Sequence, residues 1–312
     1  MTDKPALPQF AVSRRDPFPV LGAVRLAIAT ATNGRPRNED AIGVGGWVLV
    51  GDAPRPLELS VAVGPDRPAL VALTDGMGGH AAGDTAARIA ADQLTRSVPT
   101  SSDEFREVFL RADDAIHVAA SGDSAGMGCA AAAVLIYASG LVVIANLGDV
   151  RAYRVVDGYL GQVTVDDRPQ TAPGSPPTGT VTRWLGGRRR TVVEPHFYEL
   201  TVRPGDRFVL CTDGLHDVVS PSADHGFAAG GGRSVAGDLV QSAVTNDGDN
   251  VTVVVLDMVG HSAENRPIRE MRSEIPPDVV ANLSGIIAQD AEASNPPRHG
   301  TPPARRPGAS DA

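Results

Sequence analysis

Short apolar stretches alternate with polar turns along most of the chain, and this pattern predicts a strand-rich domain. Strands are predicted at residues 23–32, 41–50, 59–63, 69–74, 128–137, 141–146, 151–156, 192–200, 208–211 and 251–257. We expect the strand at 41–50 to pair with the first one, at 23–32. Pro54 and Pro56 predict a loop before the strand at 59–63, because proline is excluded from the middle of a sheet.

Three segments repeat their apolar residues at helical spacing instead. Segment 83–98 carries Ala90 and Leu94 on one face, and a second helix begins at Ser102. A third helix is predicted at 234–244. The first two helices follow each other without a strand between them. We therefore expect helices to cover the face of a sheet rather than to alternate with strands.

Five clusters of acidic residues each adjoin one of the predicted strands. They are Asn38-Glu39-Asp40, Asp75-Gly76, Asn146-Leu147-Gly148-Asp149, Thr212-Asp213-Gly214 and Asp249-Asn250. A site assembled from strand ends requires such a placement, and glycine lets the backbone approach a ligand closely. Asp-Gly more commonly marks an ordinary hairpin turn. Taken alone, each cluster therefore permits either a metal ligand or a turn.

Five motifs, in this order along the chain, together resemble the metal-dependent Ser/Thr protein phosphatases of type 2C, particularly their bacterial members. The motifs are Arg35-Pro36-Arg37-Asn38-Glu39-Asp40, Asp75-Gly76-Met77-Gly78-Gly79-His80, Gly148-Asp149-Val150-Arg151-Ala152-Tyr153, Thr212-Asp213-Gly214-Leu215-His216-Asp217 and Asp249-Asn250-Val251-Thr252. The resemblance covers roughly residues 24–257. It implies an α+β fold, a β-sandwich of two antiparallel sheets flanked by helices, and the predicted element order agrees with that fold.

The resemblance also implies a set of metal ligands. Asp75 takes the place of the bridging, catalytic carboxylate, and the Gly76 carbonyl is a ligand to one ion. Asp213 and Asp249 hold the other ion. Glu39 and Asp40 bind that second ion directly or through water. Ligation by oxygen alone favours the hard ions Mg²⁺ or Mn²⁺, with two ions bound tightly.

Three further residues have family roles beside a plainer alternative. Arg35 stands where the family grips the substrate phosphate, although alone it would be read as a solvated loop arginine. Asp149 and Asp217 match positions that, with Asp213, hold a weaker third ion in bacterial members. Asp149 can otherwise be a turn residue, and Asp217 an acid at a helix start. We expect Arg151 to pair with a carboxylate rather than to contact the substrate.

The implied activity is hydrolysis of phosphoserine and phosphothreonine monoesters in proteins, by a metal-bridged water at a two- or three-ion Mg/Mn centre. This reaction reverses Ser/Thr kinase signalling, so the implied partners are phosphorylated proteins, either kinase targets or kinases. Animal-type members carry a proton-donating histidine at the position of Met77, which cannot donate. Metal-bound water, His80 and His216 are the remaining candidates for the donor.

One segment departs from the family pattern. Residues 162–179 are short and proline-rich where typical members have a longer flap with helical content, so this chain has a shortened flap. The shortening leaves substrate selectivity open. A phosphatase of the same fold that acts on a small phosphorylated metabolite is therefore an alternative, and so is a phosphoprotein-binding pseudophosphatase or scaffold.

Composition narrows the setting. Acidic residues outnumber basic ones by 37 to 28, a net charge of −9 that does not favour nucleic acid as a partner. Cys129 and Cys211 lie in apolar runs, and we expect buried thiols in a reducing cytoplasm. No signal peptide is expected. The longest apolar run, 128–145, is interrupted by a turn and predicts two strands rather than a membrane span.

The ends of the chain differ in character from its centre. Residues 1–21 are predicted to be a disordered arm, and residues 22–259 the phosphatase domain. Residues 260–312 are a tail rich in proline and arginine, predicted to be mostly disordered. Within the tail, 278–291 is a candidate short helix that either docks a partner or packs back on the domain. The oligomeric state has no signal in the sequence.

Overall fold

A computed structural model describes residues 20–77, 82–156, 159–169, 180–187, 192–219, 230–245 and 247–261. Residues 1–19 of the N-terminal arm, His80, most of the shortened flap and residues 262–312 of the tail, with the candidate helix at 278–291, lie outside the described residues. Those expectations stay predictions. Among the described residues, no helix is both long enough and apolar enough to cross a membrane.

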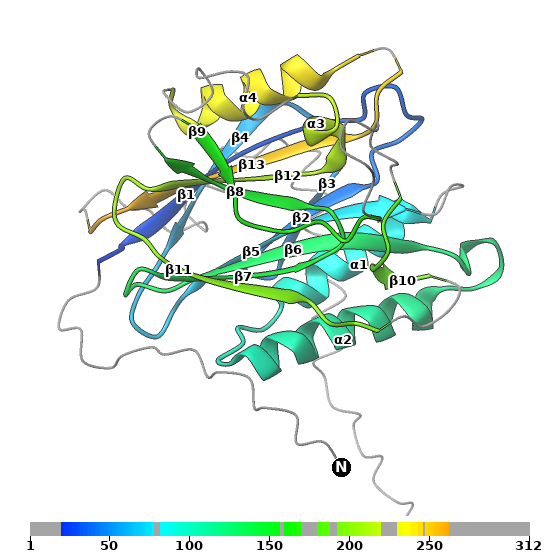
Figure 1. Ribbon diagram of the computed structural model, residues 1–312, viewed down its shortest axis with the longest axis horizontal. Coiled ribbons are helices and arrows are strands. Elements are labelled where there is room, and N and C mark those ends of the chain that lie inside the picture. Colours follow the sequence, from blue (N-terminus) through cyan, green and yellow to red (C-terminus); the bar gives the residue numbers. More distant parts are fainter. Residues whose placement is uncertain are drawn as a thin grey trace, which may run out of the picture.

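Two antiparallel sheets pack face to face and confirm the predicted sandwich (Figure 1). The strands are β1 (Ala23–Ala31), β2 (Asp40–Val44), β3 (Trp47–Val50), β4 (Ala53–Ala62), β5 (Ala69–Met77), β6 (Gly128–Ile136), β7 (Leu141–Leu147), β8 (Arg151–Val156), β9 (Tyr159–Gln162), β10 (Leu185–Gly186), β11 (His196–Thr201), β12 (Arg207–Cys211) and β13 (Val251–Val259). One sheet has the order β4-β1-β13-β12-β8-β9. The other has the order β11-β7-β6-β5-β2-β3, with β10 paired to β6.

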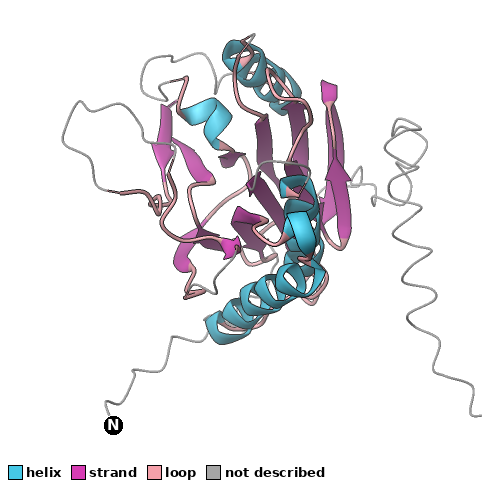
Figure 2. Ribbon diagram, turned by 90° about the vertical axis from the view of Figure 1, so that its right-hand side faces the viewer, coloured by secondary structure: helices cyan, strands magenta, loops and turns pink. Residues whose placement is uncertain are grey.

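Helices cover the outer face of each sheet, as the succession of two helices predicts. They are α1 (Gly83–Thr95), α2 (Ser102–Ala119), α3 (Asp213–His216) and α4 (Gly232–Ala243), with a short 3₁₀ turn at Gly122–Ser124. Figure 1 shows α4 over one sheet and both α1 and α2 under the other, and Figure 2 shows the same layers from the side. The turn of α3 is too short for apolar periodicity to reveal, and the sequence did not predict it.

Apolar residues fill three layers, one between the sheets and one under each helical cover. Strand β5 shows why its sequence is almost continuously apolar. Val71 and Leu73 face the other sheet, whereas Leu70 and Ala72 face the helices. A strand buried on both faces needs apolar side chains at every position, so the period-two alternation of a half-exposed strand disappears.

The expected pairing of 41–50 with the first strand is wrong. This segment is a hairpin, β2 and β3, that turns at Gly45 and Gly46, and β2 pairs with β5 in the other sheet. Both glycines have positive φ, 53° and 86°, as tight hairpin turns require. The neighbours of β1 are β4 and β13. A glycine pair inside an apolar run is a turn signal that outweighs the run's continuity.

The loop expected at Pro54 and Pro56 is also wrong, because both residues belong to β4. This strand lies at the edge of its sheet and pairs only with β1. An edge strand leaves alternate N–H groups unpaired, so proline is tolerated there. The other boundary differences are smaller: the strand expected at 192–200 lies at 196–201, and β9 and β10 were not predicted.

The strand register brings the acidic clusters to one end of the sandwich. Asp40, at the start of β2, lies opposite Asp75 near the end of β5. In the other sheet Val251 opens β13 opposite the end of β1, and Val253 lies opposite Cys211 at the end of β12. Residues just beyond these ends, including Asp213 and Asp249, therefore emerge beside Asp40 and Asp75.

Candidate metal centre

Only one of the two carboxylate oxygens of Asp40 accepts hydrogen bonds from the described residues. Its Oδ2 accepts hydrogen bonds from Thr252 Oγ1 at 2.6 Å and Thr212 Oγ1 at 3.1 Å. Its Oδ1 is buried and has no hydrogen-bond partner among the described residues. An unpaired buried carboxylate oxygen is costly unless a cation or donor completes it. Asp40 lies opposite Asp75 in the sheet, and its Oδ1 could serve as a ligand to a cation.

A relay of hydroxyl groups fixes the orientation of the Asp40 carboxylate. Asn38 Nδ2 donates to Thr30 Oγ1 at 2.7 Å, and Thr30 and Thr252 share a hydrogen bond of 2.7 Å. Since Thr252 donates its own proton to Asp40, Thr30 must donate to Thr252. We did not predict a role for Thr30, Thr212 or Thr252. Their positions beside strand-end acids are the only signal that the sequence offers.

Gly76 is packed where no side chain fits. A Cβ built on it would overlap the backbone carbonyl oxygens of Gly83 and Glu39, and its N–H donates to the Glu39 carbonyl at 3.2 Å. A Cβ on Gly83 would in turn overlap the Glu39 carboxylate. The absence of side chains at Gly76, in β5, and at Gly83, at the start of α1, thus lets Glu39 pack closely against both backbones.

Burial and mutual repulsion raise the pKa of the clustered acids. Burial, followed by the charge of Asp213, raises the pKa of Asp75 well above its usual value. Burial is also the main cause for Asp40 and Asp213, whose pKa values rise to about 7. Glu39 shifts upward too, through burial and then Asp84. Acids that resist ionisation in this way are stabilised as carboxylates by a bound cation.

The loop that carries Arg35 is tied to β13. Asn250 Oδ1 accepts from the Glu39 N–H at 2.8 Å, and its Nδ2 donates to the carbonyls of Thr32 and Arg37 at 2.8 and 3.0 Å. Arg35 Nη2 lies 2.6 Å from Asp249 Oδ2. The structure thus brings Arg35 to the acidic cluster, with its side chain 56% exposed.

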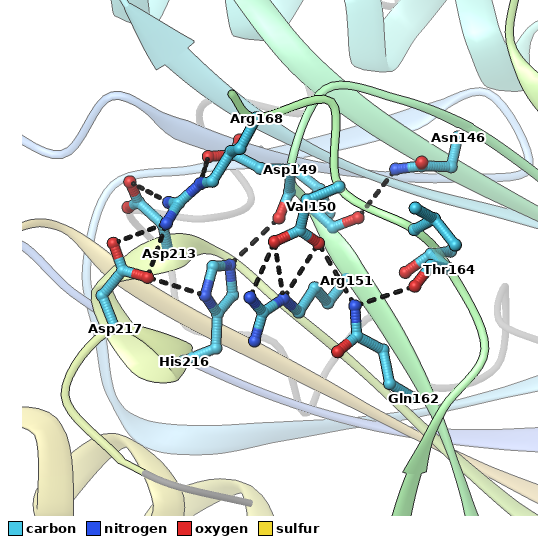
Figure 3. Close-up of polar contacts among 12 residues, drawn as sticks. Asn146, Asp149, Val150, Arg151, Gln162, Thr164, Arg168, Asp213, His216 and Asp217 are labelled. Carbon is cyan, nitrogen blue, oxygen red and sulfur yellow. Dashed lines mark hydrogen bonds and ion pairs between the residues drawn. The ribbon is translucent and has the colours of Figure 1, made fainter. Parts of the chain in front are cut away.

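A second arginine lies among the acids, and the sequence did not predict it. Arg168 follows β9 and forms ion pairs with Asp149 at 2.8 Å, Asp217 at 2.7 Å and Asp213 at 3.3 Å (Figure 3). Burial alone would raise the pKa of Asp217, but hydrogen bonds from His216 and Arg168 outweigh it and bring that pKa to about 2. The three predicted third-ion ligands therefore lie together, around a guanidinium group.

Arg151 pairs with a carboxylate, as predicted. Its guanidinium binds Asp166 through Nε at 2.9 Å and Nη2 at 2.7 Å, and its Nη1 lies 3.1 Å from the Tyr153 hydroxyl. None of these contacts involves a predicted metal ligand. Arg151 therefore holds the segment after β9.

His216 is poorly placed to donate a proton to a substrate. Its side chain is fully buried. Its Nε2 lies 3.0 Å from the Asp149 carbonyl oxygen, and its Nδ1 lies 3.1 Å from Asp217 Oδ1. Both ring nitrogens are thus engaged within the protein. Met77 is part of β5 and packs against the apolar layer between the sheets.

The donor set fits hard divalent cations better than any other ligand. Among the described residues, no three His, Cys, Asp or Glu side chains form a ready group for a metal ion. Two guanidinium groups instead occupy carboxylate oxygens of the cluster, Arg35 on Asp249 and Arg168 on Asp213. A cation bound between Asp40, Asp75 and Asp213 would nevertheless satisfy the unpaired Asp40 Oδ1 and favour the ionised form of acids whose pKa values are raised. Carboxylate and carbonyl oxygens are the ligands that Mg²⁺ and Mn²⁺ prefer.

Metal-free protein is expected to lose stability as the pH rises from about 4 to about 7. The unfolded chain releases the protons of Asp40 and Asp213 near the usual pKa of 3.8, whereas the folded protein holds them up to about 7. In between, the folded state binds more protons, so the free energy of unfolding falls with rising pH. Melting temperatures in chelator across this range test the expectation. A melting temperature that rises over the interval would contradict it.

Comparison with known proteins places these residues in a wider context. The sequence model of a family described as Protein phosphatase 2C matches residues 58–229. The serine/threonine protein phosphatase PstP of Mycobacterium tuberculosis is 32% identical over 223 residues, which cover 64% of this chain and 42% of that relative. The chain thus spans less than half the length of this curated relative.

Solved structures show the same fold. The crystal structure of the Mycobacterium tuberculosis serine/threonine phosphatase PstP/Ppp has a TM-score of 0.61 at 28% identity, covering 76% of this chain and 99% of that one. The catalytic domain of PstP in complex with two manganese ions has a TM-score of 0.59 at 29% identity, with coverage of 76% and 99%. Both solved chains are covered almost completely, so the likeness extends over the whole sandwich.

Proposed function

The chain belongs to the protein phosphatase 2C family, and from this premise we propose that it hydrolyses phosphoserine and phosphothreonine monoesters in proteins with Mg²⁺ or Mn²⁺. The observation that carries the proposal is the unpaired, buried Oδ1 of Asp40 beside Asp75 and Asp213, two acids whose pKa values are raised. Arg168 pairs with Asp213, but Asp40 Oδ1 has no hydrogen-bond partner among the described residues, and a divalent ion would provide one.

The proposed ligands divide between the two sheets. Asp75 and the Gly76 carbonyl on β5, with Glu39 and Asp40 at the start of β2, come from one sheet. Asp213 after β12 and Asp249 before β13 come from the other. When bound, two ions supply a water of lowered pKa and neutralise charge on the phosphoryl group. Asp75, whose pKa is raised well above its usual value by burial and then by the charge of Asp213, is the proposed bridging carboxylate.

The residues of this chain prepare that centre. The threonine relay holds the Asp40 carboxylate in one orientation, so no reorganisation is needed when an ion binds. Asn250 holds the Arg35 loop against β13. Arg35, paired with Asp249 but more than half exposed, can transfer its guanidinium fork to a substrate phosphate.

The substrate and setting are parts of the same proposal. Phosphorylated proteins, either kinase targets or kinases themselves, are the proposed partners, because the named relatives are serine/threonine phosphatases. A cytoplasmic location is proposed on the two free, buried cysteines, Cys129 and Cys211. The pseudophosphatase alternative would gain support from a missing ligand at Asp75, Asp213 or Asp249, and all three acids are present.

Phosphate release from three classes of substrate tests the proposal. With Mn²⁺ present, we expect turnover of phosphoserine and phosphothreonine peptides, and much weaker turnover of phosphotyrosine peptides and small phosphorylated metabolites. Arg35→Lys keeps the charge but loses the bidentate fork, so it should raise KM for all peptides. Arg55→Lys, a surface change on β4, is the matched control.

Two results would contradict the proposal. Efficient turnover of metabolites with none of peptides would favour the small-molecule alternative. Tight binding of phosphopeptides without release of phosphate, at any Mn²⁺ or Mg²⁺ concentration, would favour the scaffold.

A further inference from the structure

The position expected to hold a third ion already contains a positive charge. Arg168 donates from Nε to Asp149 Oδ2 at 2.8 Å, from Nη1 to both oxygens of Asp217 at 2.7 and 3.0 Å, and from Nη2 to Asp213 Oδ2 at 3.3 Å. Its side chain is only 11% exposed. Every nitrogen of the guanidinium group therefore faces one of the three acids.

The backbone around Arg168 is anchored on its N-terminal side. Asp166 is held by the bidentate pair with Arg151. The Asp167 N–H donates to the Gly148 carbonyl at 2.9 Å, and Asp167 Oδ2 accepts from the Gly148 N–H at 2.9 Å. Arg183 pairs with the same carboxylate. Arg168 is thus positioned by two consecutive buried or half-buried acids rather than by an exposed, freely moving loop.

Gly148 lets its backbone take the conformation that these hydrogen bonds to Asp167 require. Its φ is +100°, which favours glycine, and a Cβ there would overlap the side chain of Ala130. Because Gly148 directly precedes Asp149, the clamp on Asp167 and the first acid bound by Arg168 share one stretch of backbone. The segment after β9 and the acid cluster are therefore joined by hydrogen bonds at Gly148.

We propose that the Arg168 guanidinium is a built-in cation that takes the place of the third divalent ion, so that this chain binds two ions and not three. The inference rests on the two-ion centre proposed above and deepens it. A third ion would have to displace a guanidinium that is paired with three carboxylates and shielded from water. Breaking such a buried pair leaves an uncompensated charge and is strongly unfavourable.

The arrangement also assigns Arg168 a positioning role. Asp213 is a proposed ligand of the two-ion centre, and Arg168 pairs with its Oδ2. In a three-ion enzyme, millimolar free metal would fill the outer position. In this chain the Arg168 guanidinium occupies that position. Activity should therefore saturate when two ions are bound and should not rise further with added metal.

The test is the number of Mn²⁺ ions bound per chain, measured by equilibrium dialysis and by the signal of free Mn²⁺ in electron paramagnetic resonance. The full chain should bind two ions up to millimolar Mn²⁺. Arg168→Ala should bind a third, weaker ion, which restores the melting temperature that the substitution lowers. Arg168→Gln, closer in shape, should behave in the same way. Arg154→Ala removes an arginine–carboxylate pair with Asp206, away from these acids, and should still bind two ions.

Three results would overturn the inference. Three ions bound to the unaltered chain would show that metal displaces Arg168, a result that needs no variant to fold. A count of two bound Mn²⁺ ions in both folded Arg168 variants would show that Arg168 does not exclude a third ion. No bound Mn²⁺ in any protein would overturn both this inference and the proposed function, whereas phosphatase activity with a count of three would overturn this inference alone.

Discussion

Replacing Asp75 by asparagine is expected to lower kcat/KM for phosphopeptides by about 10³-fold, because a bridging carboxylate supports several kcal/mol of transition-state charge stabilisation. The same change should stabilise the metal-free protein. Asp75 is buried and repelled by Asp213, Asp40 and Asp149, and a neutral amide removes that repulsion. Lower activity with higher apo stability is the pattern of a ligand, whereas a structural residue would lose both.

Two measurements check this expectation. Initial rates in saturating Mn²⁺ give the activity, and thermal unfolding in chelator gives the stability. Asp92→Asn, the same chemical change at a partly buried position of α1 that pairs with Arg96, should leave both nearly unaltered. An Asp75→Asn enzyme that keeps more than a tenth of its activity would show that Asp75 is not the bridging ligand.

Removal of divalent ions is expected to abolish turnover and to lower the melting temperature. An ion at about 100 times its Kd contributes about 2.7 kcal/mol to folding, so two such ions give a shift on the order of 10 °C for a domain of this size. Added Mn²⁺ should restore both properties together. Differential scanning calorimetry and phosphate release, followed during one metal titration, provide the comparison.

Repeating the chelation at two pH values provides an internal control. Chelation should cost more stability above about pH 7 than near pH 5, because the acids are then ionised without a counter-charge. Full activity after exhaustive chelation would exclude the metal centre. A melting temperature indifferent to both metal and pH would show that Asp40 and Asp213 are stabilised by something other than ions.

Much of the fold and half of the site could be predicted from the sequence. Acids such as Asp40 and Asp213 can be recognised in the sequence because each lies at the boundary of an apolar run. The structure brings them together at one end of the sandwich. The pairing of β2 with β5 could not be derived from the sequence, because an apolar run does not reveal which of two sheets the strand joins. The prolines of β4 failed as a signal, since only the sheet order reveals an edge strand.

The residues that hold the acids were harder to predict than the acids. Thr30 and Thr252 act through hydrogen bonds that span 222 residues of sequence. No local pattern marks such a pair. Arg168 lies in a segment without periodicity, and its meaning comes from Asp149, Asp213 and Asp217, which lie 19, 45 and 49 residues away. Long-range partners of this kind are visible only once the chain has folded.

The Asp40 carboxylate belongs to one sheet, and both hydroxyls that orient it, from Thr212 and Thr252, belong to the other. The proposed ligand cluster draws on both sheets, so it cannot form until they pack against each other. Closing loops of this length comes late in folding because its entropy cost is paid before the contacts reward it. We therefore expect the proposed ions to bind only after the two sheets have docked, so the rate of Mn²⁺ uptake during refolding would time that docking.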